Sequence, residues 1–325
     1  MLLSVGVVIC GFLLLAGAAD RFVFGAAATA RNLGVSALMV GLTVVAVATS
    51  MPEMLISAIA SWQGNAGLGI GNAVGSNITN IGLVLGIAAV IRPLQVHSTT
   101  LRRELPILLA ITLVALVLML DGSLRRIDGV LLLLLLGVVI YWVASLGLRT
   151  RASDPMRSEF DSSVPHDVSM GRALGWLILG LLMLLLSSRM LVWGAVNIAQ
   201  SLGISDLVIG LTIVAVGTSL PELAASVASA LRNQHDIAIG TIIGSNMFNI
   251  LAVLGIVGIV RPGAFPAEVL TRDYPAMIGL TLALFAMAYG FRKPGQVNRL
   301  EGGVLLACFV GYQLCLYGKG TCRPF

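Results

Sequence analysis

Long apolar segments separated by short polar ones run through the whole chain of 325 residues. A helix that spans a membrane needs about 20 predominantly apolar residues. Windows of this kind fall in two groups of five, near residues 2–24, 37–61, 68–91, 103–121 and 128–148, and near residues 171–199, 206–230, 237–260, 272–291 and 301–317. The pattern therefore predicts an all-α integral membrane protein with ten transmembrane helices.

The composition agrees with this pattern and excludes a soluble protein. Hydrophobic residues make up 58% of the chain and charged residues only 11%, against about 25% charged in a typical soluble domain. The net charge of +5 does not indicate a nucleic-acid partner, because the basic residues lie in short loops between apolar segments. Residues 2–19 resemble a signal peptide but lack a basic region before them, so we interpret them as part of the first transmembrane helix.

The distribution of Lys and Arg over the loops predicts the orientation of the chain. With the N-terminus outside, thirteen basic residues fall on the inner side and seven on the outer side. Cytoplasmic loops carry the excess of basic residues in membrane proteins. Both termini are therefore predicted to lie outside, which is the periplasm for the inner membrane of a Gram-negative bacterium.

The two groups of apolar segments contain copies of one motif. Residues 41–53 read GLTVVAVATSMPE and residues 210–222 read GLTIVAVGTSLPE, at an offset of 169 residues. At the same offset and without a gap, 24 of the 53 positions in residues 41–93 are identical to those in residues 210–262. This similarity indicates a first repeat over residues 1–148, a linker over 149–170 and a second repeat over 171–325.

Each repeat holds five predicted spans, and this odd number gives the two copies opposite orientations in the membrane. Repeats of inverted topology are an architecture of secondary transporters, whose substrate site lies near the bilayer midplane between the repeats. Two halves of this kind can exchange conformations, so that a site between them faces each side of the membrane in turn. The repeat therefore predicts a transporter that works by alternating access.

Two glutamates, Glu53 and Glu222, lie deep in apolar segments at equivalent positions of the repeats. A charged side chain at the bilayer centre costs at least about 2.5–3.5 kcal/mol and usually meets an opposite charge. The same segments contain no Lys or Arg, so a bound cation is the expected partner. A protonated Glu hydrogen-bonded inside the bundle is the competing interpretation, and the occurrence at two equivalent positions disfavours it.

Further oxygen atoms surround each glutamate. Pro52 and Pro221 directly precede them, and a proline inside a helix leaves a carbonyl of the preceding turn without its donor. We therefore expect the carbonyls of residues 46–48 and 215–217 to be available as ligands. Helical spacing adds the side chains of Thr49, Ser50, Ser76 and Asn80, and of Thr218, Ser219, Ser245 and Asn249.

This set of ligands contains oxygen atoms and neither sulfur nor imidazole. It suits Ca²⁺, which takes 6–8 oxygen ligands, and also Na⁺, whereas softer transition metals are disfavoured. Taken singly, the Ser and Asn side chains can also be explained as hydrogen-bonding partners between helices.

GLTVVAVATSMPE with GNAVGSNITNI, and GLTIVAVGTSLPE with GTIIGSNMFNI, resemble the two alpha repeats of the calcium/cation antiporter superfamily, the sodium/calcium exchangers. The resemblance covers essentially the whole chain and is closest to the bacterial inner-membrane branch. It implies that the Glu of each repeat binds Ca²⁺ at mid-membrane, and that neighbouring Thr, Ser and carbonyl groups hold Na⁺. Carried over by position, the ion-binding residues are Ala46, Thr49, Ser50, Glu53, Ser76 and Asn80, and Ala215, Thr218, Ser219, Glu222, Ser245 and Asn249.

The resemblance implies an antiporter of Ca²⁺ and Na⁺ that is not an enzyme. Both ions bind as transported substrates, no resident cofactor is expected, and the protein is expected to function as a monomer in the bilayer. One departure concerns the driving ion, because sodium-coupled members often carry Asp at the position of Asn249. A Ca²⁺/H⁺ antiporter is therefore an alternative. A channel would lack the inverted pair, and an intramembrane enzyme using the paired glutamates would need a metal-binding or nucleophilic motif that the sequence lacks.

Overall fold

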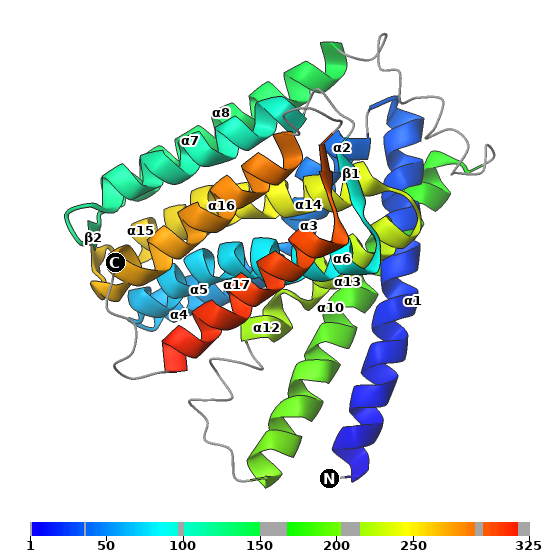
Figure 1. The fold of residues 1–325 in the computed structure, drawn as a ribbon, viewed down its shortest axis with the longest axis horizontal. Coiled ribbons are helices and arrows are strands. Elements are labelled where there is room, and N and C mark those ends of the chain that lie inside the picture. Colours follow the sequence, from blue (N-terminus) through cyan, green and yellow to red (C-terminus); the bar gives the residue numbers. More distant parts are fainter. Residues whose placement is uncertain are drawn as a thin grey trace.

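The structure is a computed structural model, and it describes residues 2–35, 37–96, 101–149, 168–202, 215–289 and 295–317. These residues are mostly helical (Figure 1). The start of the second motif, residues 210–214, and most of the linker, residues 150–167, lie outside the described residues.

The helices of the first half follow the apolar segments of the sequence. In chain order they are α1 (Leu2–Leu33), α2 (Ala37–Val40), the π-helical turn η1 (Gly41–Val45), α3 (Ala46–Thr49), α4 (Met51–Trp62), α5 (Ala66–Thr79), the π-helical turn η2 (Asn80–Leu85), α6 (Gly86–Ile91), α7 (Leu101–Met119) and α8 (Arg126–Arg149). The segment α5–η2–α6 is one continuous helical stretch, as is η1–α3.

The second half repeats this order. Its described elements are α10 (Met170–Ser201), α12 (Ala215–Thr218), α13 (Leu220–Leu231), α14 (His235–Phe248), the π-helical turn η5 (Asn249–Val253), α15 (Leu254–Val260), the π-helical turn η6 (Val269–Asp273), α16 (Tyr274–Tyr289) and α17 (Arg299–Tyr317). Helix lengths agree between the halves: α1 and α10 have 32 residues each, α4 and α13 have 12, and α5 and α14 have 14.

Several of these helices can cross a membrane by themselves. Among the described residues, six helices have the length and apolar composition of a span, and a seventh span results if η1–α3 and α4 are taken together across their bend. The apolar helices Glu104–Met119 and Leu220–Leu231 are shorter. The chain is therefore a helical membrane protein.

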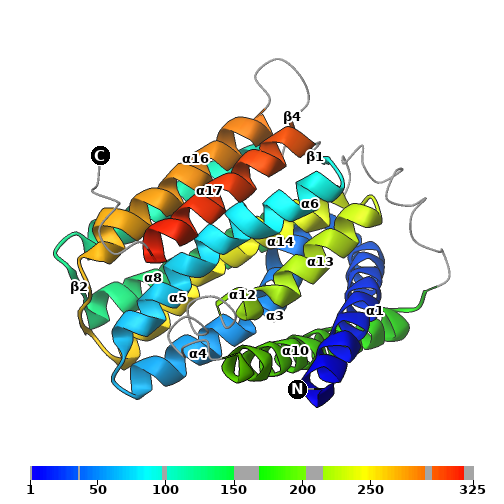
Figure 2. The ribbon, with the colours of Figure 1, turned by 60° about the horizontal axis from the view of Figure 1, so that its bottom comes forward.

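The long helices α1 and α10 lie against each other and are steeply inclined to the remaining bundle (Figures 1 and 2). Glycines of each helix face the other helix, where an added side chain would collide, and small residues of this kind let two backbones approach closely. The facing pairs are Gly11 with Leu191, Gly180 with Phe22, Gly25 with Leu177, and Gly194 with Val8. Their numbers rise in one helix as they fall in the other, so the two helices run antiparallel.

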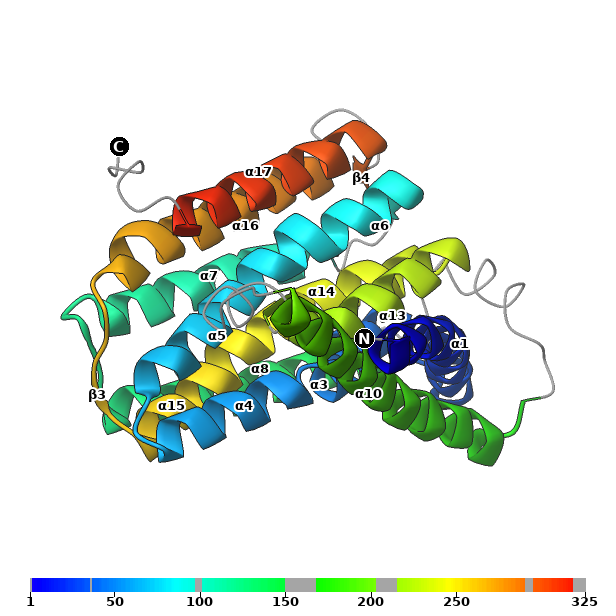
Figure 3. The same cartoon turned by 90° about the horizontal axis from the view of Figure 1, so that it is seen from below.

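Two short antiparallel strand pairs join the two halves of the chain. β1 (Leu94–Val96) pairs with β4 (Gly295–Val297), and β2 (Ser123–Leu124) pairs with β3 (Gly263–Ala264). The two pairs lie at opposite ends of the bundle (Figures 1 and 3).

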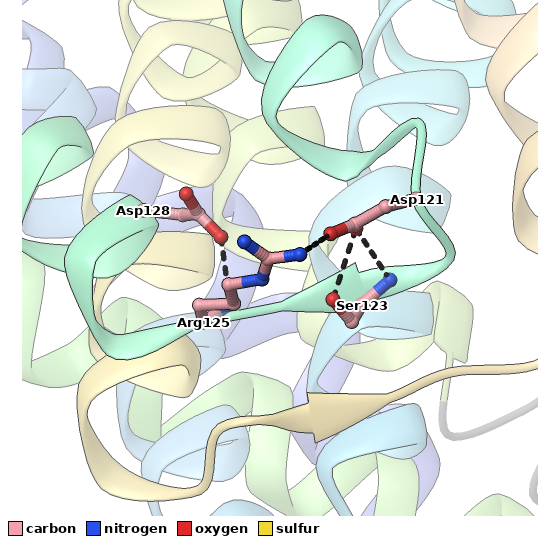
Figure 4. A network of polar contacts seen from close by, with 4 residues as sticks. All are labelled: Asp121, Ser123, Arg125 and Asp128. Carbon is pink, nitrogen blue, oxygen red and sulfur yellow. Dashed lines mark hydrogen bonds and ion pairs between the residues drawn. The ribbon is translucent and has the colours of Figure 1, made fainter.

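Polar contacts fix the turn between α7 and α8 (Figure 4). The Asp121 carboxylate accepts hydrogen bonds from the hydroxyl of Ser123 at 2.9 Å and from its backbone N–H at 3.0 Å, and it forms an ion pair with Arg125. The Ser123 donors, together with the Arg125 charge, hold the pKa of Asp121 below its usual value. Asp128 accepts the backbone N–H of Arg125 at 2.7 Å and so caps the start of α8.

Candidate ion-binding site

The two helices that carry the glutamates are broken at equivalent places. Ser50 separates α3 from α4 with φ −81° and ψ 0°, and Ser219 separates α12 from α13 with φ −89° and ψ 8°. The segments before and after Ser50 are bent by 46°. Glu53 and Glu222 lie in the first turn of the helix that follows each break, where unpaired backbone N–H groups favour a negative charge.

The carbonyl of Ala46, one of those expected to be available as ligands, accepts hydrogen bonds within the chain. This carbonyl accepts the backbone N–H of Ser50 at 3.0 Å and the Thr49 hydroxyl at 3.4 Å. The N–H that Pro52 lacks would bond four residues earlier, to Ala48 and not to Ala46. In the second half, the backbone N–H of Ser219 donates to the carbonyl of Val216 at 3.1 Å, and Ala215 is the first residue of α12.

Both glutamate side chains are buried, each with 1% of its surface exposed. They lie close enough for their charges to interact. The hydroxyl of Thr218 lies beside the carboxyl group of Glu53, and the hydroxyls of Thr49 and Ser50 lie beside that of Glu222. Each carboxyl group therefore receives a hydroxyl from the other half of the chain.

Basic side chains do not neutralise these carboxyl groups in the described part of the chain. Ion pairs found there include Arg125 with Asp121, Arg232 with Asp20 and Arg272 with Asp273. Within the same described residues, no group of three or more His, Cys, Asp or Glu side chains could hold a metal ion. The described neighbours of the two carboxyl groups are hydroxyl groups, backbone and each other.

The helices α5 and α14 supply the remaining polar side chains. Ser76, Asn80, Ser245 and Asn249 are all buried, and the hydroxyls of Ser245 and Thr49 lie 3.4 Å apart. Asn80 and Asn249 each begin a π-helical turn, η2 and η5. Such turns are rare and occur frequently at functional sites.

The structure adds two side chains that the sequence analysis missed. The amide nitrogen of Asn80 donates to Asn246 Oδ1 at 3.1 Å, and the amide nitrogen of Asn249 donates to Asn77 Oδ1 at 3.2 Å. Asn77 and Asn246 directly follow Ser76 and Ser245 in the repeated motif. Their presence at equivalent positions of both repeats is the signal that could have identified them.

Three equivalent pairs of buried oxygen atoms at this place have no hydrogen-bond partner. They are Ser50 Oγ and Ser219 Oγ, Glu53 Oε2 and Glu222 Oε2, and Asn80 Oδ1 and Asn249 Oδ1. Buried polar groups are nearly always hydrogen-bonded, and a buried group without a partner costs roughly 1–3 kcal/mol. Two of these six oxygens belong to the carboxyl groups and four to Ser and Asn side chains, and all six are of the hard kind that binds Ca²⁺.

Not every residue expected at the site joins these contacts. Ala46 packs against α14 near Gly244, and Ser76 is buried on α5, but no hydrogen bond is described from the Ser76 side chain to the other site residues. Glu104 was not expected to matter, yet it is only 1% exposed in the first turn of α7, apart from the glutamate breaks.

Comparisons with known proteins cover nearly the whole chain. The family described as "sodium/calcium exchanger protein" matches residues 3–144 and 172–318. CaxA of Alkalimonas amylolytica is 47% identical over 323 residues, which are 98% of this chain and 100% of the relative. The inner membrane protein YrbG of Escherichia coli is 40% identical over 319 residues, 98% of each chain.

Solved structures agree with these sequence comparisons. A structure of the sodium-calcium exchanger NCX_Mj soaked with Na⁺ and Ca²⁺ matches with a TM-score of 0.82 at 33% sequence identity. The match covers 99% of this chain and 100% of that one.

Proposed function

The chain belongs to the sodium/calcium exchanger family, and on that premise we propose that it exchanges Ca²⁺ for Na⁺ across the membrane by alternating access at a site between its two halves. The observation that carries the proposal is the set of six buried oxygen atoms without hydrogen-bond partners, two in Glu53 and Glu222 and four in the Ser and Asn side chains of the two motifs. The proposed ion ligands are the twelve residues expected from the sequence: Ala46, Thr49, Ser50, Glu53, Ser76, Asn80, Ala215, Thr218, Ser219, Glu222, Ser245 and Asn249.

Charge balance favours Ca²⁺ as one of the two transported ions. Two ionised carboxylates repel each other in a buried site, and one divalent cation between them removes the net charge. The unpartnered hydroxyl and amide oxygens of Ser50, Ser219, Asn80 and Asn249 bring the number of available oxygens into the range of 6–8 that Ca²⁺ takes.

Competition for the same carboxylates accounts for the coupling between the two fluxes. Na⁺ also prefers hard oxygen ligands, and Thr49 and Thr218 add hydroxyls beside the carboxyl groups. A site whose charge is balanced by Ca²⁺ has no charge left for Na⁺, and the reverse holds as well. Each ion therefore leaves the site before the other binds, and Ca²⁺ and Na⁺ move across the membrane in opposite directions.

We propose ten transmembrane helices in two inverted five-helix repeats, residues 1–148 and 171–325, with the linker over 149–170. The contacts between α1 and α10 support this symmetry. Adding 169 converts Gly11 into Gly180 and Phe22 into Leu191, so the facing pairs Gly11–Leu191 and Phe22–Gly180 are equivalent. An axis in the membrane plane that exchanges the two halves produces such pairs.

The strand pairs support the same symmetry. Adding 169 converts Leu94 of β1 into Gly263 of β3, and β4 occupies the place in the second half that β2 has in the first. The exchange therefore converts the pair β1–β4 into β3–β2. The two pairs lie at opposite ends of the bundle (Figure 3), which supports the proposal that the equivalent ends of the repeats face opposite sides of the membrane.

The proposed location is the inner membrane of a bacterium, with both termini outside. The excess of basic residues on the inner loops and the description of YrbG as an inner membrane protein support this location. The proposed functional unit is the monomer, because the site lies between the two halves of one chain.

A Ca²⁺/H⁺ antiporter is the second candidate, and Asn249 is the observation that favours it. Its amide supplies an oxygen atom but no charge. With only two carboxylates in the site, two protons neutralise the empty site as well as one Ca²⁺ does.

Exchange across reconstituted vesicles tests the proposal. Purified protein is placed in lipid vesicles loaded with Ca²⁺, with Na⁺ or with a large organic cation, and uptake of isotopic Ca²⁺ is followed. We expect rapid uptake with internal Ca²⁺ and only background uptake with the organic cation, because an antiporter needs an ion to carry back. Equal uptake under all three conditions would show a channel, and the absence of uptake under all three would refute the proposal.

A further inference from the structure

Two crossed amide pairs link the central helices of the two halves. One pair runs from Asn80 to Asn246 and the other from Asn249 to Asn77. Adding 169 converts Asn77 into Asn246 and Asn80 into Asn249, so the two pairs are equivalent. All four side chains are 1% exposed, and each pair joins α5–η2 to α14–η5.

We propose that Asn77 and Asn246 are positioning residues that orient the amides of Asn249 and Asn80, so that these present oxygen and not nitrogen to the transported cation. This inference rests on the proposed function and adds residues outside the expected set of ligands. It assigns to each ligand amide one partner from the other half of the chain.

An asparagine ligand needs such a partner because the oxygen and the nitrogen of its side-chain amide have opposite polarity. The Oδ1 atom accepts and can bind a cation, whereas the Nδ2 group carries two hydrogens and repels one. Rotation of the amide by half a turn exchanges the two ends with little change of shape. Only the surrounding hydrogen bonds decide which end faces the ion.

In both pairs the ligand amide turns its nitrogen toward its partner from the other half. Asn80 donates its nitrogen to Asn246 at 3.1 Å, and Asn249 donates its nitrogen to Asn77 at 3.2 Å. The Oδ1 atoms of Asn80 and Asn249 are left buried and without a partner. They are therefore available to a cation at the place where the other unpartnered oxygens of the site gather.

The orientation of Asn77 is itself set by a third helix. Its amide nitrogen donates to Met277 Sδ of α16 at 3.4 Å, which turns its oxygen toward Asn249. Sulfur is a weak acceptor, but it cannot donate, so the reverse orientation of Asn77 would place its oxygen against an atom that offers it no hydrogen. The hydrogen bonds thus all donate in one direction, from Asn249 to Asn77 and from Asn77 to Met277.

A carboxylate in place of Asn249 makes the positioning residue unnecessary, and this gives a decisive test. Both oxygens of a carboxylate can bind a cation, so rotation no longer matters. In the Asn249→Asp background, loss of Asn77 is then expected to leave the affinity for the ion unchanged. Loss of Asn246, which orients Asn80, is expected to lower that affinity as much as in the original background.

The test measures Ca²⁺ binding by the purified full-length protein in detergent, as the half-saturating Ca²⁺ concentration obtained from the rise of the melting temperature with Ca²⁺. We expect Asn77→Ala and Asn246→Ala each to raise this concentration about tenfold, because the ligand amide loses the hydrogen bond that orients its oxygen. In the Asn249→Asp background, Asn77→Ala is expected to leave the concentration within about twofold and Asn246→Ala to raise it about tenfold again. Asn77→Leu, which fills the space of the amide, serves as a second variant with the same expected result.

The outcomes separate this inference from the proposed function. If Ca²⁺ does not stabilise the unaltered protein at all, the proposed Ca²⁺ site is wrong. If it does, and Asn77→Ala costs the same in both backgrounds, Asn77 only stabilises the fold and the inference is wrong. An unchanged Ca²⁺ requirement of Asn77→Ala and Asn77→Leu in the original background would also overturn it.

Discussion

Among single residues, the two central glutamates differ from the buried acids Asp273 and Asp128 in the groups around them. Asp273 is paired with Arg272 and accepts the hydroxyl of Tyr312 at 3.0 Å. Asp128, at the start of α8, accepts a backbone N–H. Glu53 and Glu222 have hydroxyl neighbours and each other, so we expect bound cations or protons to balance their charge.

Neutralising either glutamate is therefore expected to abolish Ca²⁺ transport. In Glu53→Gln or Glu222→Gln, the site keeps its shape but loses half of the charge that balances Ca²⁺. The loss of one partner of a buried ion pair costs several kcal/mol, so Ca²⁺ affinity should fall by more than about a hundredfold. The measurement is uptake of isotopic Ca²⁺ into vesicles containing equal amounts of each protein.

Glu301→Gln is the matched control for these two variants. Glu301 lies in the first turn of α17, where it accepts the backbone N–H of Asn298 at 2.8 Å, and a glutamine can accept the same hydrogen bond. Its transport should equal that of the unaltered protein. Normal uptake by either Glu53→Gln or Glu222→Gln would contradict the two-carboxylate site.

Among the secondary-structure elements, the breaks at Ser50 and Ser219 shape the site. Each break lies two residues before a proline, and it turns a new helix N-terminus and its first-turn glutamate toward the centre of the molecule. A continuous helix would lack this N-terminus, whose unpaired N–H groups favour the carboxylate.

Pro52→Ala is expected to impair transport without unfolding the protein. Alanine restores the N–H that can bond to the carbonyl of Ala48, and it favours a continuous helix through Ser50. The initial rate of Ca²⁺ exchange should fall by about tenfold or more, since the displaced Glu53 no longer meets its partners, while the melting temperature should stay equal or rise. A lowered melting temperature with an unchanged rate would mean that the proline serves stability alone.

The positions of most helices could be predicted from the sequence because hydrophobic pattern and repetition are local signals. The end of α1 could not. The expected helix stops near residue 24, whereas α1 continues to Leu33 through small buried residues such as Gly25 and Ala26. The charged residues near the expected end of α1 contact side chains of the second half. Asp20 pairs with Arg232 at 2.6 Å, and Arg21 lies over the ring of Trp176.

The site was predictable to the extent that it lies within the repeated motifs. Glu53 and Glu222 stand out because acids are rare in apolar segments. The contacts of Thr49 with Glu222 and of Thr218 with Glu53 cross between the halves, and no spacing along one segment reveals them. Asn77 and Asn246 were missed for the same reason, since their partners are on the opposite helix.

For the whole molecule, the proposed symmetry and the charges of the loops make a prediction about orientation. Ten spans bring both termini to the same side, and the excess of basic residues on the inner loops makes this side the outside. Alkaline phosphatase fused to the C-terminus should be active in a bacterial host, and a green fluorescent protein at the same place should be dark. The opposite pair of results would require an odd number of spans or an inverted molecule.

The central claim, that Ca²⁺ is exchanged for Na⁺, is tested most directly by separating the two possible driving ions. Purified protein is reconstituted in vesicles, and uptake of isotopic Ca²⁺ is measured first with an outward Na⁺ gradient at equal pH on both sides, and then with a pH gradient and no Na⁺. We predict uptake that follows the Na⁺ gradient, is abolished in Glu53→Gln and does not respond to the pH gradient. Uptake that ignores Na⁺ and follows the pH gradient would contradict the claim and identify a Ca²⁺/H⁺ antiporter.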